Sequence, residues 1–445
     1  MGRLLFSRVV QLLFKRLLLV SLLALLVGPA LQARFHFRHE KVLDGAFTIA
    51  PHPALTWAGL RANTFQPALE HYLEDRIGFR SWLIRLRNQL AFSVFRVSRS
   101  ADVVIGAHDV LFQHTYIEAY AGKNLLPAAE VQFRVRRLWA VQQALAQRGV
   151  QLLFAIAPNK ARFEPENLPP SWRPPLGTVT NYDLFTQQLR AQGVNLLDFV
   201  PLFAKWKGTA PYPLYPRSGI HWSGYGATRA ADTLMRRIGA LTGTRLPAVR
   251  AVGPPHLVYR SDSLRSTDND LGATMNLLFE RETTPLAYPR LAFAPPRPGQ
   301  RLPSVLFVSD SFVWGLMVFA PFIQHQLAPD TRVWFYNKSV HAPDSLYHAT
   351  GEQAGDLDLR AQLAARQAVV LLFTEHNMVE QEYGFTERVY RLFYPATAAE
   401  TQAVDRLAAT LQQCVPPAEA RQNSGQLAQR LHKQAQALYD RAHTP

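Results

Sequence analysis

The chain of 445 residues is 48% hydrophobic and only 18% charged, which allows a large buried core and excludes a disordered protein. Its formal net charge of +15 falls to +9 when the six basic residues among the first 38 are set aside, and this excess still favours an anionic polymer or a lipid surface as partner. Nucleic acid is not expected as a partner, because the sequence has neither a basic helix nor an aromatic-basic strand pattern.

The first 35 residues have the pattern of a signal-anchor helix. An almost continuous apolar run over 17–33 lies between basic residues, with Arg3, Arg8, Lys15 and Arg16 before it and Arg34 and Arg38 after it. We favour an uncleaved anchor over a removed signal, because Leu31 does not suit a cut after Ala33, although a cut one residue earlier stays open. The leading basic residues predict a cytoplasmic N-terminus, a single span of the inner membrane, and a catalytic domain in the periplasm or extracytoplasmic space.

Residues 36–125 are predicted to form a helical cap with short strands. Over 66–95 the apolar residues recur at three- and four-residue steps, which indicates one or two amphipathic helices. The recurring residues are Leu69, Leu73, Ile77, Trp82, Leu83, Leu86 and Leu90. Two short strands are expected at 102–105 and 110–112.

From residue 126 to 395 the pattern alternates between helix and strand, which predicts an α/β domain with a parallel sheet covered by helices on both faces. The predicted strands are 150–157, 194–199, 304–309, 331–336 and 368–374. The predicted helices are 128–147, 182–192, 223–240, one from 312 onward, and 357–366. Residues 242–300 are expected to be an insertion with a helix near 271–279, and 396–445 a polar helical tail with a break at Pro416 and Pro417.

The first candidate for chemistry is Ser311, which follows the predicted strand 304–309 at a turn into a helix. Such a turn exposes the hydroxyl and places backbone amides where they can form an oxyanion hole, as acyl transfer requires. Asp310, directly before it, is included in the candidate catalytic set. The alternative is that Ser311 is only a helix N-cap.

The candidate base for Ser311 is His221, in a loop that contains Gly219, Gly224 and Gly226 and enters a helix. Trp222 could shield its imidazole from water. The alternative is a solvated loop histidine. No metal site is expected, because the histidines lack the spacing of a metal-binding helix and the single cysteine, Cys414, lies in the tail. The proposed chemistry needs no cofactor.

Polar residues also follow the other predicted strands. In an open parallel sheet these positions share one edge, so the residues there are candidates for oxyanion or substrate contacts: Asn159, Lys160, Asn337, Glu375 and Asn377. Lys160 or Arg162 could hold a uronate carboxylate. The alternative is that the asparagines cap helices and close turns.

Together these segments resemble the SGNH hydrolase superfamily, and specifically its alginate O-acetyltransferase branch of the AlgX/AlgJ type. The resemblance covers most of 66–390 and includes residues 72–80 (YLEDRIGFR), 157–160 (APNK) and the His221 and Ser311 segments. It implies an SGNH-hydrolase-like, flavodoxin-like sheet flanked by helices.

One position departs from the family's pattern. The family's Asp-Thr-His-Trp becomes Gly219-Ile220-His221-Trp222, so the acid that should orient the imidazole is missing from its usual place. The partner of His221 could be a backbone carbonyl, the Ser218 hydroxyl, or a carboxylate from elsewhere, for which the candidates are Asp270, Asp198 and Glu375.

The sequence therefore predicts an extracytoplasmic O-acetyltransferase in which His221 deprotonates Ser311 and the acyl-enzyme passes its acyl group to an exported, alginate-like polysaccharide. The resemblance implies a membrane-bound O-acyltransferase as the partner that supplies the acyl group. Two alternatives stay open: a carbohydrate esterase or deacetylase that uses the same residues, and a non-catalytic polysaccharide-binding or scaffold protein of a secretion complex.

Overall fold

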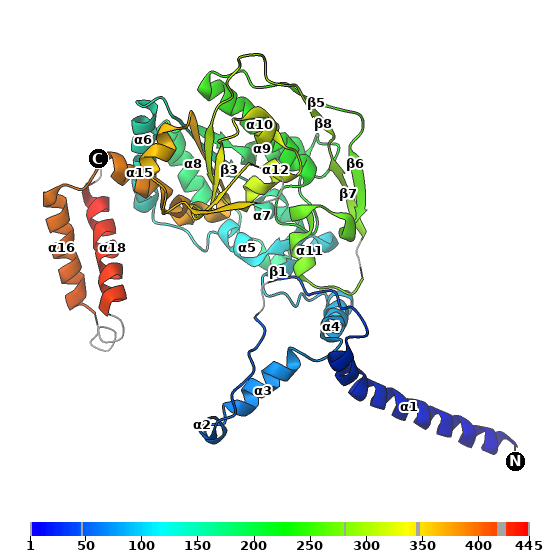
Figure 1. Ribbon diagram of the computed structural model, residues 1–445. Helices are drawn as coiled ribbons and strands as arrows, with labels where there is room; N and C mark the ends of the chain where they lie inside the picture. Colours follow the sequence, from blue (N-terminus) through cyan, green and yellow to red (C-terminus); the bar gives the residue numbers. More distant parts are fainter. Residues whose placement is uncertain (1, 46–47, 280–281, 344–347, 416–423, 444–445) are drawn as a thin grey trace. The chain divides into compact units, whose positions relative to one another are not determined.

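The computed structural model describes residues 2–45, 48–279, 282–343, 348–415 and 424–443. The chain divides into two compact units (Figure 1). Unit 1 consists of Met1–Val103 with Leu271–Arg281, and unit 2 consists of Val104–Asp270 with Glu282–Pro445.

Unit 2 is built on a seven-stranded sheet with the order β12-β11-β10-β9-β13-β3-β4. Five strands run parallel: β4 (Leu196–Asp198), β3 (Gln151–Ala157), β13 (Ala368–Thr374), β9 (Val305–Ser309) and β10 (Arg332–Phe335). All residues of β9 and β13 are buried, as expected for central parallel strands covered on both faces. The predicted parallel α/β sheet is confirmed.

The sheet continues beyond the predicted strands at its β10 edge. There β11 (Ser339–His341) pairs antiparallel with β10, and β12 (Ala349–Gln353) pairs antiparallel with β11. These strands lack a sequence signal because β11 is only three residues long and every residue of β12 is exposed.

Helices cover the sheet on both faces, as Figure 1 shows. The main ones are α6 (Ala128–Ala146), α8 (Asn181–Ala191), α9 (Phe199–Lys207), α10 (Gly224–Thr242), α14 (Leu359–Ala364) and α15 (Phe385–Phe393). Helices α6, α8 and α15 bury their apolar residues against the strands in one core cluster. The predicted helix from 312 onward is instead three short pieces, Ser311–Trp314, α12 (Gly315–Val318) and α13 (Phe322–Gln326), because Pro321 cannot continue a helix.

The predicted insertion contains two small antiparallel strand pairs. Strand β5 (Val249–Ala251) pairs with β8 (Leu291–Phe293), and β6 (His256–Arg260) pairs with β7 (Glu282–Tyr288). The helix predicted near 271–279 is a shorter α11 (Asp270–Thr274). It ends before Asn276, whose φ of 48° is incompatible with a continuing helix.

Unit 1 contains α1 (Gly2–Phe35), α2 (Trp57–Arg61), α3 (Phe65–Glu74) and α4 (Arg80–Phe95). The predicted amphipathic stretch is thus two helices, divided at Gly78 and Phe79; the φ of Phe79 is 61°. Within α1, the segment Val10–Phe35 is long and apolar enough to cross a membrane. At the start of unit 2, the short strands β1 (Val103–Ile105) and β2 (Leu111–Gln113) pair with each other where they were predicted.

The tail consists of α16 (Ala398–Gln413) and α18 (Ser424–His443), which lie side by side (Figure 1). Buried ion pairs connect it to the sheet domain: Asp440 contacts Arg137 of α6 at 2.6 Å and Arg391 of α15 at 2.5 Å. The break predicted at Pro416 and Pro417 lies outside the described residues.

Candidate active site

Ser311 lies at the carboxyl end of β9, the central strand between β13 and β10. The strand is wholly apolar up to Ser309, and Asp310 then ends it by accepting a hydrogen bond from the Phe312 N–H at 3.0 Å. This local turn puts the Ser311 side chain at the rim of the sheet, while Asp310 beneath it is fully buried.

His221 lies next to Ser311 although the two are 90 positions apart. Its Nε2 is 2.7 Å from Ser311 Oγ. The ring packs against Phe312 with 4.7 Å between centroids, and the neighbouring Trp222 is completely buried against the same phenylalanine. A serine hydroxyl in this arrangement can pass its proton to the imidazole as it attacks a carbonyl carbon.

Asp270 is the carboxylate that binds the other ring nitrogen. Its Oδ2 is 2.5 Å from His221 Nδ1, and its Oδ1 accepts the backbone N–H of Ile220 at 2.9 Å. One carboxylate therefore fixes both the ring and the backbone of the histidine loop. With Ser311, these residues form a continuous hydrogen-bonded line of acid, imidazole and hydroxyl, the geometry of a Ser-His-Asp triad.

The replacement of the family's acid by Gly219 has a steric explanation. A Cβ built on Gly219 would lie 2.4 Å from the backbone oxygen of Thr267. Only glycine lets the segment before Asp270 approach the histidine loop this closely. A side chain at position 219 would push away the backbone at Thr267 and Asp268. The acid in this chain is therefore Asp270, which follows that backbone in the insertion.

Asp268 fixes the segment that carries Asp270 through buried hydrogen bonds. It is fully buried, and it accepts the Tyr288 hydroxyl at 2.8 Å and the Gly224 N–H at 3.3 Å. Burial raises the pKa of Asp268 to about 7, against which the bonds from Tyr288 and Gly224 act. The structure thus gives Asp268 a bracing position next to Asp270.

Lys160 does not face a substrate. Its side chain is 1% exposed, and Nζ donates to the carbonyl oxygens of Pro216 at 2.6 Å, Arg217 at 3.1 Å and Gly219 at 2.7 Å. An ammonium group has three protons to donate. The prediction that Lys160 holds a uronate is thus wrong in this structure, where the lysine instead fixes the loop that carries His221.

The candidate amides donate to protein acceptors. Asn159 Nδ2 binds the Tyr116 carbonyl at 2.7 Å, and its Oδ1 caps α7 (Lys160–Phe163). Asn337 Nδ2 binds the Tyr383 carbonyl at 3.0 Å. Asn377 Nδ2 binds Asp310 Oδ2 at 2.8 Å. These residues tie together the strand ends around Ser311, which matches the turn-closing alternative considered from the sequence.

The other candidate acids bind elsewhere. Asp198 caps α9 and accepts bonds from Tyr182 at 3.0 Å and Arg190 at 2.6 Å. Glu375 is buried, pairs with Arg162, and accepts the Asn159 N–H at 2.8 Å. Burial raises the pKa of Glu375 to about 7, and Arg162 opposes that rise.

Tyr336 is a residue that the sequence analysis did not single out. It follows β10 directly, its N–H donates to the Ser309 carbonyl at 2.8 Å, and its φ is 51°. Burial raises the pKa of the phenol, which keeps it protonated, and hydrogen bonding with the side chain and backbone of Ser311 acts against the rise. Its place immediately after a parallel strand was the signal that could have identified it.

A match to the family described as "SGNH hydrolase-like domain, acetyltransferase AlgX" covers residues 103–330, more than half of the chain. The chain belongs to this AlgX family. The family resemblance stated from the sequence is confirmed, and the matched region contains Ser311, His221 and Asp270.

Relatives of this AlgX-family chain include probable alginate O-acetylases AlgJ. The Pseudomonas aeruginosa protein is 28% identical over 208 residues, which are 45% of this chain and 46% of the relative. The Azotobacter vinelandii protein is 28% identical over 200 residues, which are 42% of this chain and 48% of the relative. The chain thus spans about half the length of the curated relatives it matches. Among solved structures, the O-acetyltransferase domain of Pseudomonas putida AlgJ is 20% identical, with 66% of this chain and 99% of that one covered and a TM-score of 0.43.

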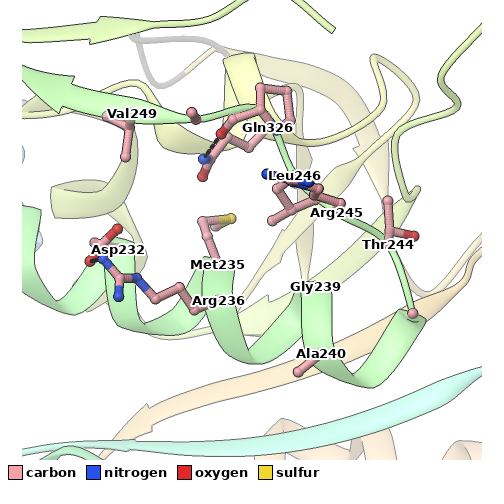
Figure 2. A pocket seen from close by; sticks show the side chains of 13 residues that line it. Asp232, Met235, Arg236, Gly239, Ala240, Thr244, Arg245, Leu246, Val249 and Gln326 are labelled. Atoms are coloured by element: carbon pink, nitrogen blue, oxygen red, sulfur yellow. Dashed lines mark hydrogen bonds and ion pairs between the residues drawn. The ribbon is translucent and has the colours of Figure 1, made fainter. Parts of the chain in front are cut away.

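A separate cavity of the AlgX-family domain, lined by none of the triad residues, lies beside the C-terminal half of α10 (Figure 2). It has a volume of about 580 Å³ and is lined by Arg236, Arg245 and Gln326 among others. Arg236 is paired with Asp232 at 2.8 Å, and Gln326 donates to the Pro247 carbonyl at 2.6 Å. Within the described parts of the chain, no three His, Cys, Asp or Glu side chains are grouped as a metal site.

Proposed function

We propose that this protein is an extracytoplasmic O-acetyltransferase that transfers an acyl group to hydroxyls of an exported, alginate-like polysaccharide through an acyl-enzyme on Ser311. The observation that carries the proposal is the hydrogen-bonded line from Asp270 through His221 to Ser311. The family membership and the names of the AlgJ relatives support the choice of acyl group and acceptor.

In the first half-reaction, Ser311 Oγ attacks the carbonyl carbon of the donor while His221 Nε2 takes its proton. The tetrahedral intermediate collapses, the donor's leaving group departs with that proton, and the acyl group stays on Ser311. In the second half, His221 removes the proton of a sugar hydroxyl as its oxygen attacks the ester carbonyl, and Ser311 Oγ then departs with that proton from His221. Asp270 holds Nδ1–H throughout and stabilises the imidazolium that forms twice.

The oxyanion of each tetrahedral intermediate needs donors. We assign one of them to Tyr336, which directly follows β10, donates its N–H to the Ser309 carbonyl at 2.8 Å, and has a phenol that interacts with Ser311. A donor fixed in position before the reaction stabilises developing charge without reorganising, which is usually the largest single contribution of such a site.

We also propose that α1 anchors the protein in the inner membrane as a single span, with the N-terminus in the cytoplasm. Its apolar stretch Val10–Phe35 is long enough, and the basic residues before it follow the positive-inside tendency. A membrane-bound O-acyltransferase partner would then supply the acyl group beside the anchor. The net charge of +9 that remains beyond the first 38 residues suits a polyanionic acceptor such as a polyuronate.

The decisive experiment uses the full chain in detergent with a fluorophosphonate probe and an acetyl-ester donor. The parent is expected to become labelled and to move acetyl onto an oligouronate, whereas Ser311→Ala and His221→Ala lose both properties. Ser263→Ala, an exposed serine on the insertion, is the matched control and should behave as the parent. Labelling that survives Ser311→Ala would refute the nucleophile, and release of free acetate without acetylated sugar would identify an esterase.

A further inference from the structure

Helix α4 in unit 1 has its polar side inward. Its buried residues are the polar Ser81, Arg85 and Asn88, followed near the C-terminal end by Ala91 and Phe92. Ser81 Oγ donates to Glu40 at 3.0 Å, Arg85 Nη2 donates to the Val42 carbonyl at 2.9 Å, and Asn88 Nδ2 donates to the Met275 carbonyl at 2.9 Å. These bonds give specific partners to Ser81, to Asn88 and to the Nη2 end of the Arg85 guanidinium, so they fix the inward face.

The opposite face of α4 is apolar and points outward. Its residues follow steps of three and four, as one stripe of a helix requires: Leu83, Leu86, Leu90, Val94 and, just past the helix end, Val97. Each is between 45% and 64% exposed, and Trp82 and Phe95 beside the stripe are 52% and 71% exposed. A helix with this inverted pattern needs an apolar surrounding on its outer side, because in water the stripe stays hydrated.

The apolar side of α4 lies next to the anchor helix α1. Gly78, just before α4, lies so close to α1 that a Cβ on it would be 2.3 Å from the Pro29 carbonyl oxygen. Between the two helices is a groove of about 1060 Å³, lined by Ala24, Leu25 and Pro29 from α1 and by Phe79, Trp82 and Leu83 from the α4 side. The α1 residues belong to the stretch Val10–Phe35, so the medium around that stretch also reaches the groove.

We propose that the outward face of α4 lies in the outer leaflet of the membrane that α1 crosses, and that lipid acyl chains fill the groove between the two helices. This inference rests on the proposed membrane span of α1. The charges nearby fit the same occupant: Arg38 lines the groove, and Arg87 is exposed beside the stripe, where anionic headgroups would meet it. Trp82 at the mouth of the groove suits the interface between acyl chains and headgroups.

The test is a depth measurement on the full chain in vesicles of phosphatidylethanolamine and phosphatidylglycerol. The exposed Cys414 is first replaced by serine, and an environment-sensitive dye is attached at Leu86→Cys. We expect blue-shifted emission, and loss of most of the fluorescence when the lipids carry a nitroxide high on the acyl chain. The matched control is Leu176→Cys, a fully exposed leucine in unit 2, whose dye should respond to aqueous iodide and not to nitroxide lipid.

A second variant separates the stripe from the anchor. With the dye at Leu83→Cys, the pair Leu86→Gln and Leu90→Gln should restore most of the fluorescence in nitroxide vesicles, while the protein still floats with the vesicles through α1. If the protein does not float with the vesicles, the proposed membrane span of α1 is itself refuted. Flotation together with a water-exposed dye at position 86 would overturn the inference and leave the span intact. Blue-shifted emission that nitroxide lipid does not quench, and that shifts back to the red on dilution of the protein, would identify a second copy of the chain as the occupant and would also overturn it.

Discussion

Helices α10 of unit 2 and α4 of unit 1 bury opposite kinds of side chain. In unit 2, helix α10 has its apolar residues inside, with Ala230, Ala231 and Leu234 fully buried, and the polar groups of the site gather at the sheet rim. In unit 1, helix α4 buries Asn88 and Arg85 and turns its leucines outward. Both helices show the same three-and-four periodicity, so periodicity identifies a helix and its two faces but does not say which face meets water.

Substitutions in the two regions should therefore affect different properties of the protein. Changes to the polar line at the sheet rim are expected to remove chemistry, and changes to the polar face of α4 are expected to remove stability. The variants below test that separation.

The largest effect is expected from Asp270→Asn. An asparagine keeps the size of the side chain but cannot stabilise the imidazolium or hold the ring in the required tautomer, and such a change lowers kcat by about 10⁴ in a complete triad. The measurement is acetyl transfer by the full chain. Asp198→Asn, a carboxylate bound to Tyr182 and Arg190, is the control and should retain activity. Equal activity of Asp270→Asn and the parent would show that another group orients His221.

Lys160→Met tests the support beneath the histidine. It leaves three buried carbonyls without their shared donor, so the free energy of unfolding should fall by about 3 to 5 kcal/mol. Activity should fall too, because the loop carrying His221 loses its anchor. Lys207→Met removes an exposed lysine bound to Glu166 and should change stability by about 1 kcal/mol or less. Denaturant unfolding in detergent measures both, and similar losses in the two variants would contradict the bracing role.

Tyr336→Phe removes only the phenol oxygen next to Ser311. We expect kcat to fall by about 10 to 100-fold with KM nearly unchanged, since an oxyanion donor acts mainly in the transition state. Tyr383→Phe is the matched control, because its hydroxyl binds Asn377 at 3.0 Å and not the nucleophile. A Tyr336→Phe effect confined to KM would assign the phenol to substrate binding instead.

The sequence indicated the sheet and two of the three triad residues, Ser311 and His221. Ser311 and His221 stand beside strong local signals, a buried strand before one and a glycine-rich loop around the other. Asp270 could only be named among three candidate carboxylates, because its contact depends on a distant segment reaching the loop at Gly219, and no periodicity encodes that approach.

Other elements escaped prediction for physical reasons of their own. Lys160 was expected at a substrate because it follows a strand, but three nearby carbonyls take all its protons. Strand β11 has only three residues and every residue of the edge strand β12 is exposed, so neither shows a hydrophobic alternation. In unit 1 the amphipathic helices were predicted, but the inward polar face of α4 depends on partners such as Glu40 and Met275.

Asn88→Leu moves the test to unit 1. The leucine removes the donor to the Met275 carbonyl, so the free energy of unfolding should fall by about 1 to 3 kcal/mol even though the substitution is apolar. The reverse change on the outer face, Leu90→Asn, should alter stability in detergent by about 0.5 kcal/mol or less. The opposite order of effects would mean that α4 has its apolar side inward in solution. Acetyl transfer by Asn88→Leu should match the parent wherever the protein is folded.

The last effect is a gradual one on the acidic side of the pH profile, where Asp268 is expected to act. Burial raises its pKa from 3.8 to about 7, so between these values the folded state holds a proton that the unfolded chain has released. Folding stability should therefore decline as pH rises through this window, by at most about 1.4 kcal/mol per pH unit, and become independent of this group above it. Asp268→Asn cannot titrate and should make that decline shallower in denaturant unfolding measured across the window, while Glu375, whose pKa burial also raises to about 7, keeps its own share. Asp262→Asn, an exposed aspartate of the same insertion, should leave the parent's slope in place. If both variants keep the parent's slope, Asp268 is ionised in the folded protein, and the bonds from Tyr288 and Gly224 outweigh its burial.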